Sequence, residues 1–240
     1  MKCIFSVDVE DWFHILDVPS TPKISKWDSL PSRVEKNFLK LLDIFDEFSV
    51  SVTCFFLGWV AAKFPGLVKE ANERGHEIAS HGYSHELTYR MSPTAFMDDA
   101  VKAKKLLEDI SGKIVIGYRA SGFSYTKDSP WFFDRLIETG HKYDSSVFPA
   151  WHGHGGIEVS NYSPHLIQRN GGNIIEFPIS VYKVFGQPVC FFGGGYLRFF
   201  PFQIIKKMAK KVQKKKRPVI FYLHPRDIDP LQPRMQMKRH

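Results

Sequence analysis

The stretch Lys2–Phe13 reads KCIFSVDVEDWF, an apolar and β-branched run that ends in acidic residues. Such a run predicts a buried β-strand over Lys2–Val9, whose carboxyl end is marked by the acids. Six further runs of this kind are Ser51–Leu57, His76–Ser80, Ile114–Arg119, Lys142–Val147, Asn173–Ile179 and Pro218–Leu223. Between the runs, helices are predicted at about Ser32–Glu47, Val60–Arg74, Ser92–Ile110, Ser129–Thr139 and Phe202–Lys216. This alternation predicts an α/β protein with a parallel sheet covered by helices, either an open sheet or a barrel.

We expect residues 1–240 to form a single domain. A chain of 240 residues can build a full core, and it contains no internal repeat, low-complexity linker or break in composition. Two long segments rich in Pro, Gly or His, Asp17–Ser29 and Phe148–Asn173, are interpreted as functional loops rather than linkers.

The cysteines and the N-terminal acidic residues indicate in which cellular compartment the protein is expected. The three cysteines are an odd number, and each lies in an apolar run, which argues against a disulfide framework and favours a reducing compartment. Acids at positions 8, 10 and 11 do not fit a secretory signal. No run approaches the roughly 20 apolar residues of a membrane-spanning helix. We therefore expect a soluble, cytoplasmic protein.

The net charge of +8 arises from one segment. Lys206–Arg217, KKMAKKVQKKKR, holds eight basic residues and no acid, so the remaining chain is nearly neutral. No nucleic-acid-binding motif accompanies it, and we expect no nucleic-acid partner. The simplest interpretation is a surface helix with a solvated cationic face. The alternative is a patch that contacts anionic lipid or glycolipid phosphates at the inner face of a membrane.

Chemically active residues follow the predicted strands at their carboxyl ends, which are the ends where α/β barrels and open sheets build their sites. These residues are Asp8, Glu10, Asp11, His81, His85, Arg119, Asp144 and His224. Their convergence on one edge of the sheet predicts a single site.

Two of these groups together suit a metal ion. His81 and His85 are four residues apart, so one tight loop or helical turn can aim both imidazoles at one cation. Asp8 and Glu10 lie two apart and project to the same side of a strand. One carboxylate can then bind the metal while its neighbour stays free as a base. A metal such as zinc lowers the pKa of bound water from 15.7 to about 7.

The remaining groups suit proton transfer. His224, after the last strand, is the expected general acid, and Arg119 is expected to orient the base carboxylate. Asp144 is expected to hold the imidazole of His224 and keep it protonated. The alternative for Arg119 and Asp144 is a structural ion pair at the edge of the sheet.

Five motifs in this order resemble those of the polysaccharide deacetylases, carbohydrate esterase family four with the NodB-like fold. The motifs are Ser6–Trp12 (SVDVEDW), His81–His85 (HGYSH), Tyr118–Phe123 (YRASGF), Tyr143–Ser146 (YDSS) and Leu223–Pro225 (LHP). They extend over nearly the whole chain. The resemblance implies a distorted (β/α) barrel with about seven parallel strands.

The resemblance also implies roles for individual residues. Asp8 matches the general base, His224 the general acid, Arg119 the residue paired with the base and Asp144 the partner of the acid histidine. His81 and His85 match the metal ligands, and a backbone N–H near Gly122 would stabilise the oxyanion. Contacts to sugar are expected from Trp12, Phe123 and Tyr196, although the glycine-rich stretch before Tyr196 also fits a flexible turn.

The chain departs from the usual family motifs at two positions. Val9 stands where the family usually has a metal-binding aspartate, as in a branch with the first motif Asp-Val-Glu-Asp-Trp-Phe. Glu10 is therefore the expected carboxylate ligand, with Asp11 in reserve. Ser121 replaces the usual proline, which is expected to loosen the loop that carries Arg119.

The sequence thus predicts a hydrolase that depends on a divalent metal, with zinc expected. It would remove an acetyl or formyl group from an amino sugar, as polysaccharide or as a lipid- or nucleotide-linked precursor, in surface polysaccharide or lipopolysaccharide assembly. One alternative is a metal-poor hydrolase of a small cyclic amide. The other is a catalytically inactive carbohydrate-binding protein, which would have no need of Asp8, Arg119, Asp144 and His224 together.

Overall fold

The computed structural model describes residues 3–16, 20–153 and 155–235. All seven predicted strands are present, each shorter than or as long as the run that predicts it. They are β1 (Cys3–Val9), β2 (Thr53–Phe56), β3 (Glu77–Ser80), β4 (Gly117–Tyr118), β5 (Tyr143–Asp144), β7 (Gly172–Glu176) and β10 (Val219–Leu223). The position of Lys2, where the first run begins, lies outside the described residues.

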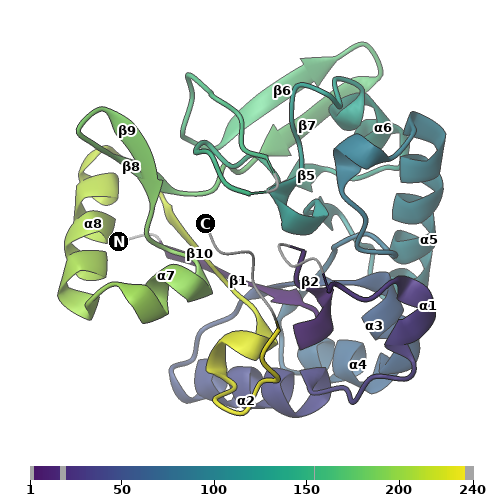
Figure 1. The fold of residues 1–240 in the computed structure, drawn as a ribbon. Helices are drawn as coiled ribbons and strands as arrows, with labels where there is room; N and C mark the ends of the chain where they lie inside the picture. The colour runs from purple at the N-terminus through teal and green to yellow at the C-terminus, as the bar shows by residue number, and fades with distance from the viewer. Residues whose placement is uncertain (1–2, 17–19, 154, 236–240) are drawn as a thin grey trace.

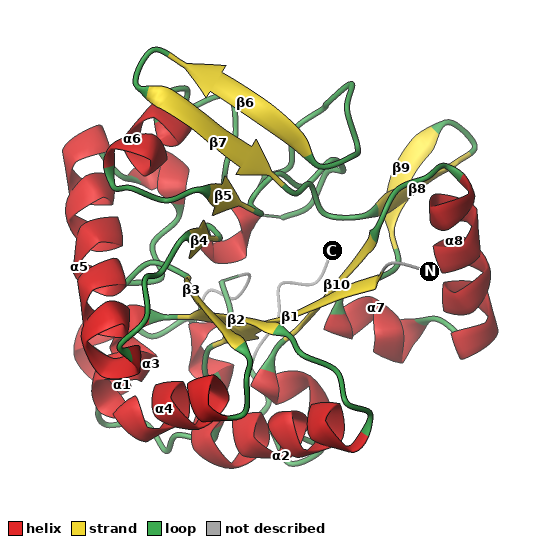
Figure 2. Ribbon diagram, turned by 180° about the vertical axis from the view of Figure 1, so that it is seen from behind, coloured by secondary structure: helices red, strands yellow, loops and turns green. Residues whose placement is uncertain are grey.

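These strands form one curled sheet in the order β10-β1-β2-β3-β4-β5-β7-β6. The first seven are parallel, and β6 (His165–Arg169) adds an antiparallel edge to β7. The sheet curls into a half-barrel, with β10 and β1 facing β7 and β6 across its open side (Figure 2). The predicted barrel class is confirmed, and the structure adds the eighth strand.

Two further elements lie in segments where no strand was expected. Strand β6 interrupts the segment Phe148–Asn173, whose length and content of Pro, Gly and His predict a loop. A separate hairpin of β8 (Val181–Val184) and β9 (Gln187–Cys190) follows β7. The hairpin and the last two helices lie beside β10 at the open side of the half-barrel (Figure 1).

The helices cover the outside of the sheet (Figure 2). They are α1 (Ile24–Trp27), α2 (Val34–Glu47), α3 (Gly58–Lys63), α4 (Pro65–Glu73), α5 (Pro93–Ser111), α6 (Phe132–Glu138), α7 (Gly194–Phe199) and α8 (Phe202–Lys214). In α2, Val34, Phe38, Leu41 and Phe45 recur at helical spacing and are buried against the sheet. None of the helices within the described ranges is long and apolar enough to cross a bilayer.

One of the predicted helices is divided into two helices in the structure. The segment Val60–Arg74 was expected to be continuous, but α3 ends at Lys63 and α4 begins at Pro65. Proline cannot donate the hydrogen bond that a continuous helix requires there, and it disfavours helical geometry in the preceding residue. Pro65 instead opens the new helix at its first turn, where its missing N–H costs nothing.

Because seven strands are parallel, their carboxyl ends meet at one edge. Short 3-10 turns follow three of them directly: η1 (Trp12–His14) near β1, η3 (Ser121–Phe123) after β4 and η4 (Pro225–Ile228) after β10. A fourth, η2 (Thr88–Arg90), lies between β3 and α5. The turns place short, rigid loops around the space above the sheet edge.

Candidate active site

A pocket of about 220 Å³ lies at the carboxyl ends of the strands. It is lined by residues from both ends of the chain, because β1 and β10 are neighbours in the sheet. The predicted site residues that line it are Asp8, Glu10, His81, His85, Gly122, Phe123, Tyr196 and His224. The expected convergence on one edge is confirmed for Asp8, Glu10, His81, His85 and His224, whereas Asp11, Arg119 and Asp144 are not among the residues that line the pocket.

Three buried side chains in this pocket form a cluster suited to a metal ion. Ligand atoms of Glu10, His81 and His85 all lie within 4.8 Å of one another. Glu10 Oε2 is buried 2.5 Å from His85 Nε2 and, apart from this contact, has no partner among the described residues. A cation shared by the two side chains would satisfy this arrangement.

Hydrogen bonding, burial and nearby charges act on two members of the same cluster, His81 and Glu10. His81 Nδ1 donates to the backbone oxygen of Arg119 at 2.8 Å, which leaves Nε2 with its lone pair free for a metal. Burial lowers the pKa of His81 to about 4, so its ring is neutral at pH 7. Burial raises the pKa of Glu10, but Arg226 and His85 outweigh it and hold that pKa well below its usual value. Glu10 and His81 can therefore bind a divalent cation at neutral pH without first losing a proton.

The loop between the two histidines is shaped by residues of the same motif. Gly82 has φ +72°, and a side chain there would come within 2.8 Å of Asp99. Asp99, on α5, accepts hydrogen bonds from the backbone N–H groups of Tyr83 and Ser84 at 2.7 and 3.0 Å. The glycine and the aspartate together fold HGYSH back on itself, so that both imidazoles face Glu10.

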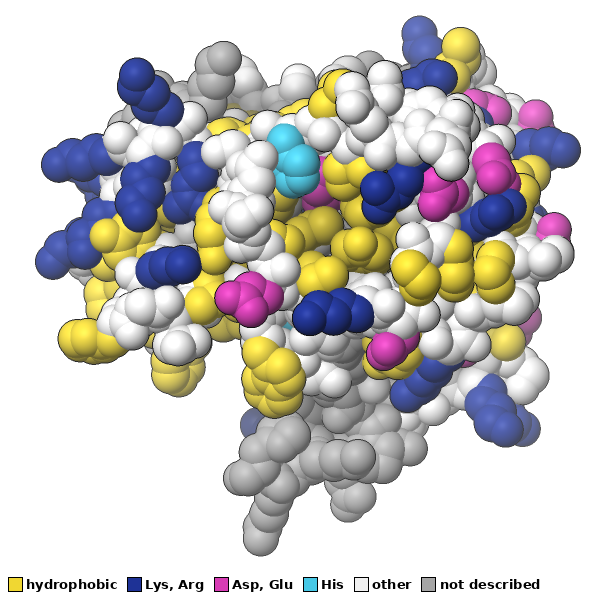
Figure 3. Space-filling model, turned by 90° about the horizontal axis from the view of Figure 1, so that it is seen from above, with side chains coloured by type: hydrophobic (Ala, Val, Ile, Leu, Met, Phe, Trp, Pro, Cys, Tyr) yellow, Lys and Arg dark blue, Asp and Glu magenta, His cyan; other side chains and the backbone are white. Residues whose placement is uncertain are grey.

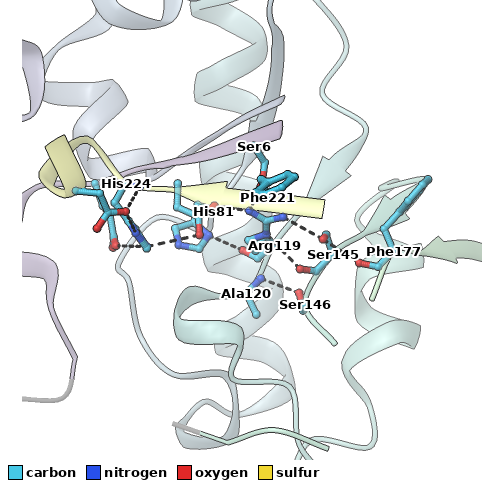
Figure 4. Close-up of polar contacts among 12 residues, drawn as sticks. Ser6, His81, Arg119, Ala120, Ser145, Ser146, Phe177, Phe221 and His224 are labelled. Carbon is cyan, nitrogen blue, oxygen red and sulfur yellow. Dashed lines mark hydrogen bonds and ion pairs between the residues drawn. The ribbon is translucent and has the colours of Figure 1, made fainter. Parts of the chain in front are cut away.

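Asp8 and Arg119 form a buried ion pair on the other side of the pocket. Arg119 donates to Asp8 Oδ1 at 2.6 Å and to Ser6 Oγ at 2.9 Å, and both charged side chains are almost fully buried. Ser145 holds the guanidinium from the opposite side through its backbone oxygen and its hydroxyl (Figure 4). The expected pairing of Arg119 with Asp8 is confirmed, and the alternative ion pair with Asp144 is not formed among the described residues.

His224 lies among carboxylates, but Asp144 is not one of them. Its Nδ1 is 3.1 Å from Asp227 Oδ2, and its Nε2 is 3.2 Å from Glu10 Oε1 and 3.8 Å from Asp8 Oδ2. The expected contact between Asp144 and His224 is wrong. Asp144 bonds Ser146, through its hydroxyl at 2.6 Å and its backbone N–H at 2.9 Å. The reason is local, since Asp227 follows His224 by three residues, at the distance that one 3-10 turn bridges.

Asp11 has a structural role. Its carboxylate accepts from the backbone N–H of Trp12 at 2.8 Å and from that of Arg33 at 3.0 Å, and it binds the Ser32 hydroxyl. It therefore caps η1 and the start of α2 together. These contacts use both of its oxygens, and Asp11 does not belong to the cluster of possible metal ligands, whereas Glu10 does.

Two sequence expectations about neighbouring residues need revision. Trp12 donates its indole N–H to the backbone oxygen of Pro31 and packs on the apolar core, so it is not among the residues that line the pocket. Ser121 donates to the backbone oxygen of His81 at 3.3 Å, a tether between the second and third motifs that proline could not supply.

Three site residues were missed by the sequence reasoning. Arg226 is bonded to Glu10 Oε1, Asp227 to His224, and His14 lines the pocket with its ring 5.6 Å from that of His85. His14 Nδ1 accepts from the backbone N–H of Asp11 at 2.9 Å. Arg226, Asp227 and His14 each follow a motif residue by one or two positions. This proximity to the motifs was the one feature of the sequence that could have identified them.

Comparisons with known proteins agree with this fold. Residues 24–138 match a family model described as polysaccharide deacetylase, and residues 145–240 match one described as a domain of unknown function, DUF3473. A peptidoglycan deacetylase of Helicobacter pylori is 26% identical over 156 residues, which are 60% of this chain and 52% of the relative. The chain thus spans about half the length of this curated relative.

Solved structures show the same fold. The crystal structure of a putative polysaccharide deacetylase from Mycobacterium smegmatis has a TM-score of 0.64 at 19% identity, covering 95% of this chain and 79% of that one. The Puue allantoinase structure has a TM-score of 0.63 at 17% identity, covering 96% and 79%. Strands from both family matches, including β2 and β10, lie in the one sheet.

Proposed function

We propose that this chain, of which residues 24–138 match the polysaccharide deacetylase family model, is an amide hydrolase that removes an N-acyl group, acetyl or formyl, from an amino sugar. One observation carries the proposal: a buried donor set for a cation, a base held by arginine and a histidine held by carboxylates share one pocket. Amide hydrolysis needs a base for the attacking water and an acid for the departing nitrogen.

The chain's own residues divide this chemistry between them. Arg119 occupies Asp8 Oδ1, which leaves Oδ2 to accept the proton of a water that attacks the acyl carbon. As the carbon–nitrogen bond breaks, His224 donates a proton from Nε2 to the leaving amine. The backbone N–H of Gly122, on the pocket wall, is the proposed donor to the oxyanion. The products are a free amine and a carboxylate.

We propose zinc as the resident metal, with Glu10 Oε2, His81 Nε2 and His85 as its ligands. Two imidazoles and one carboxylate are a donor set of catalytic zinc sites. A divalent ion held there supplies Lewis-acid chemistry to the carbonyl and acidifies water. The close approach of Glu10 Oε2 to His85 Nε2, with no other partner for that oxygen among the described residues, supports this assignment.

The substrate screen follows from the proposal. Purified protein is offered N-acetyl and N-formyl amino sugars, free, in peptidoglycan fragments and linked to lipid or nucleotide, together with a small cyclic amide, and amine release is measured. We expect release from an amino sugar that Asp8→Asn abolishes and Asp128→Asn, at an exposed carboxylate, does not. Turnover of the cyclic amide alone would favour the alternative activity. Sugar binding without turnover under several divalent metals would contradict the hydrolase proposal.

We also propose that the substrate is a lipid-linked sugar processed at the inner face of an anionic membrane. Helix α8 buries Ile205 and Val212 and exposes Lys206, Lys207 and Lys210. Phe199 and Phe202, at the junction of α7 and α8, are 78% and 69% exposed. Basic side chains gather along the left edge of the molecule in Figure 3, the side on which α8 lies in Figure 1. Cationic and aromatic side chains together suit a surface of anionic lipid.

The position of α7 supports this substrate class. Tyr196 on α7 lines the pocket, while Phe199 at its end lies on the exposed surface. Arg198 on the same helix is 3.4 Å from Asp227, the partner of His224. A sugar on a lipid carrier could therefore reach the pocket while α8 contacts the membrane.

Vesicle flotation tests the membrane proposal. We expect binding to phosphatidylglycerol vesicles, not to phosphatidylcholine vesicles, and loss of binding on replacing Lys206, Lys207 and Lys210 with Gln. The same replacements at exposed Lys36, Lys40 and Lys105 are the matched control. Equal binding by both triple variants, or equal binding to both lipids, would contradict the proposal. Binding to RNA rather than to anionic vesicles would assign α8 to a different partner.

A further inference from the structure

Two fully buried carboxyl groups lie side by side outside the catalytic pocket. Asp144 ends β5, Glu176 ends β7, and the two are register partners in the parallel ladder, so their side chains point the same way. Both residues are 0% exposed. The cation that faces them is Arg119, and its guanidinium is bonded to Asp8, Ser6 and Ser145. Tyr118 and Tyr125 also face the pair. Two adjacent carboxylates buried in this way cannot both ionise, so one of them retains a proton.

The hydrogen bonds locate that proton. Asp144 uses both of its oxygens as acceptors, from the hydroxyl and the backbone N–H of Ser146. Glu176 Oε1 accepts from the backbone N–H of Val147 at 3.0 Å. Glu176 Oε2 is buried and has no donor among the described residues, so it is satisfied when it carries a proton and donates to Asp144. Burial raises the pKa of Glu176 well above its usual value, and the charge of Asp144 raises it further.

We propose that Glu176 is protonated in the folded protein, donates a hydrogen bond to Asp144, and with it forms a positioning pair for the loop that carries Arg119 and Gly122. The pair acts through Ser146. The Ser146 hydroxyl donates to Asp144 and accepts from the backbone N–H of Ala120 at 2.7 Å (Figure 4). Ala120 directly follows Arg119 and lies two residues before Gly122.

The same segment holds the arginine itself. Glu176 accepts the backbone N–H of Val147, and Asp144 accepts that of Ser146. The hydroxyl of Ser145 donates to the backbone oxygen of Phe177 at 2.9 Å. Ser145 in turn accepts hydrogen bonds from the guanidinium of Arg119 through its backbone oxygen and its hydroxyl. A displaced Ser145–Val147 segment would therefore move the partner of the base and the proposed oxyanion donor together. This gives Asp144 a role in place of the expected contact with His224.

Two variants of Glu176 test whether a hydrogen-bond donor is needed at this position. Glu176→Gln carries a permanent N–H donor of the same shape, whereas Glu176→Ala removes the donor that Glu176 supplies to Asp144. We expect Glu176→Ala to lower kcat by about 10- to 100-fold, as the loss of an outer supporting group typically does, and Glu176→Gln to restore it. A Glu176→Gln variant that folds but is as inactive as Glu176→Ala would overturn the positioning role. This readout rests on the proposed hydrolase function.

Two further measurements do not depend on activity. The infrared spectrum at neutral pH should contain the C=O band of a protonated carboxyl group, lost in Glu176→Gln and retained in the exposed control Glu158→Gln. Above about pH 4.5 the glutamic acid ionises in the unfolded chain but stays protonated in the fold, so folding takes up a proton. The Tm of the wild type should therefore fall relative to that of Glu176→Gln as the pH rises from about 4.5 to 8. Absence of the band, or parallel Tm curves, would overturn the protonated pair even if the protein proves to be an active deacylase.

Discussion

His224 Nδ1 lies 3.1 Å from Asp227 Oδ2, and its other ring nitrogen lies 3.2 Å from Glu10 Oε1. Both nitrogens thus face carboxylate oxygens, and the imidazolium is the form that can donate from both. Asp227 also accepts the backbone N–H of His224 at 2.8 Å, which fixes the ring at the end of β10. These contacts hold the ring on the pocket wall, where the proposed general acid must act.

Replacing His224 and Asp227 one at a time should distinguish the effect of the proposed general acid from that of the carboxylate that holds it. We expect His224→Asn to lower kcat by about 10²- to 10⁴-fold, the usual contribution of a general acid. Asp227→Asn should keep a side chain of the same shape beside the histidine but lose the carboxylate that bonds its ring and its backbone N–H, so kcat should fall by less than in His224→Asn. A kcat for Asp227→Asn equal to that of the wild type would contradict the supporting role of this pairing. Asp128→Asn, at an exposed loop carboxylate, serves as control.

The metal cluster predicts a defined metal content. The wild type should carry about one equivalent of divalent metal, and His81→Ala or Glu10→Gln should lose it, because each removes one of three protein ligands. A chelator should lower the Tm of the wild type and leave that of His81→Ala unchanged, since only a protein that binds the ion is stabilised by it. Elemental analysis and differential scanning fluorimetry measure both effects. His165→Ala, in β6, is the matched control, and a metal-free active wild type would contradict the prediction.

The seven parallel strands and most site residues could be predicted because each strand is a short apolar run followed directly by polar residues. The same rule located Glu10, His81 and His224, which the structure brings together. Strands β6, β8 and β9 were not predictable in this way. They are hairpin strands at the edge of the fold, where one face is exposed and the apolar pattern is weak.

The pairing of side chains was harder to predict than their convergence. Asp144 ends β5 and Asp227 follows β10, and residue type alone does not show which one reaches His224. The choice depends on the 3-10 turn η4, which brings Asp227 back over the histidine, and on Ser146, which binds Asp144. Arg226 and His14 were missed for the same reason, since short turns set their directions.

Asp11 should prove structural. Asp11→Ala removes the acceptor for the N–H groups of Trp12 and Arg33, and we expect the free energy of unfolding to fall by about 0.5–2 kcal/mol, as for other lost helix caps. Its metal content should remain at the wild-type level, in contrast to Glu10→Gln. Loss of metal in a folded Asp11→Ala variant, with metal retained in Glu10→Gln, would reverse the assignment of the ligand.

The Asp8–Arg119 pair predicts a recovery of stability without recovery of activity. Arg119→Met leaves Asp8 buried without its cation, and we expect the free energy of unfolding to fall by about 3–5 kcal/mol. Adding Asp8→Asn removes the stranded charge, so the double variant should be more stable than Arg119→Met alone. It should remain inactive, because no base is left. Urea denaturation measures the cycle, and additive losses of stability would show that the two residues do not interact.

Asp229 gives a prediction for pH dependence. Arg33 pairs with its carboxylate, Asn37 donates to it at 2.9 Å, and these contacts join η4 to the start of α2. Hydrogen bonding to Arg33 holds the pKa of Asp229 below its usual value of about 3.9, so this stabilisation is complete above that pH and disappears as the carboxylate protonates in the fold. We expect Asp229→Asn to lower the Tm by about 2–4 °C at pH 7, the shift of a loss near 1 kcal/mol in a chain of this size. The gap to the wild type should close as the pH falls below about 4. Asp128→Asn should show no gap at either pH, and a gap for Asp229→Asn that widens in acid would contradict the assignment.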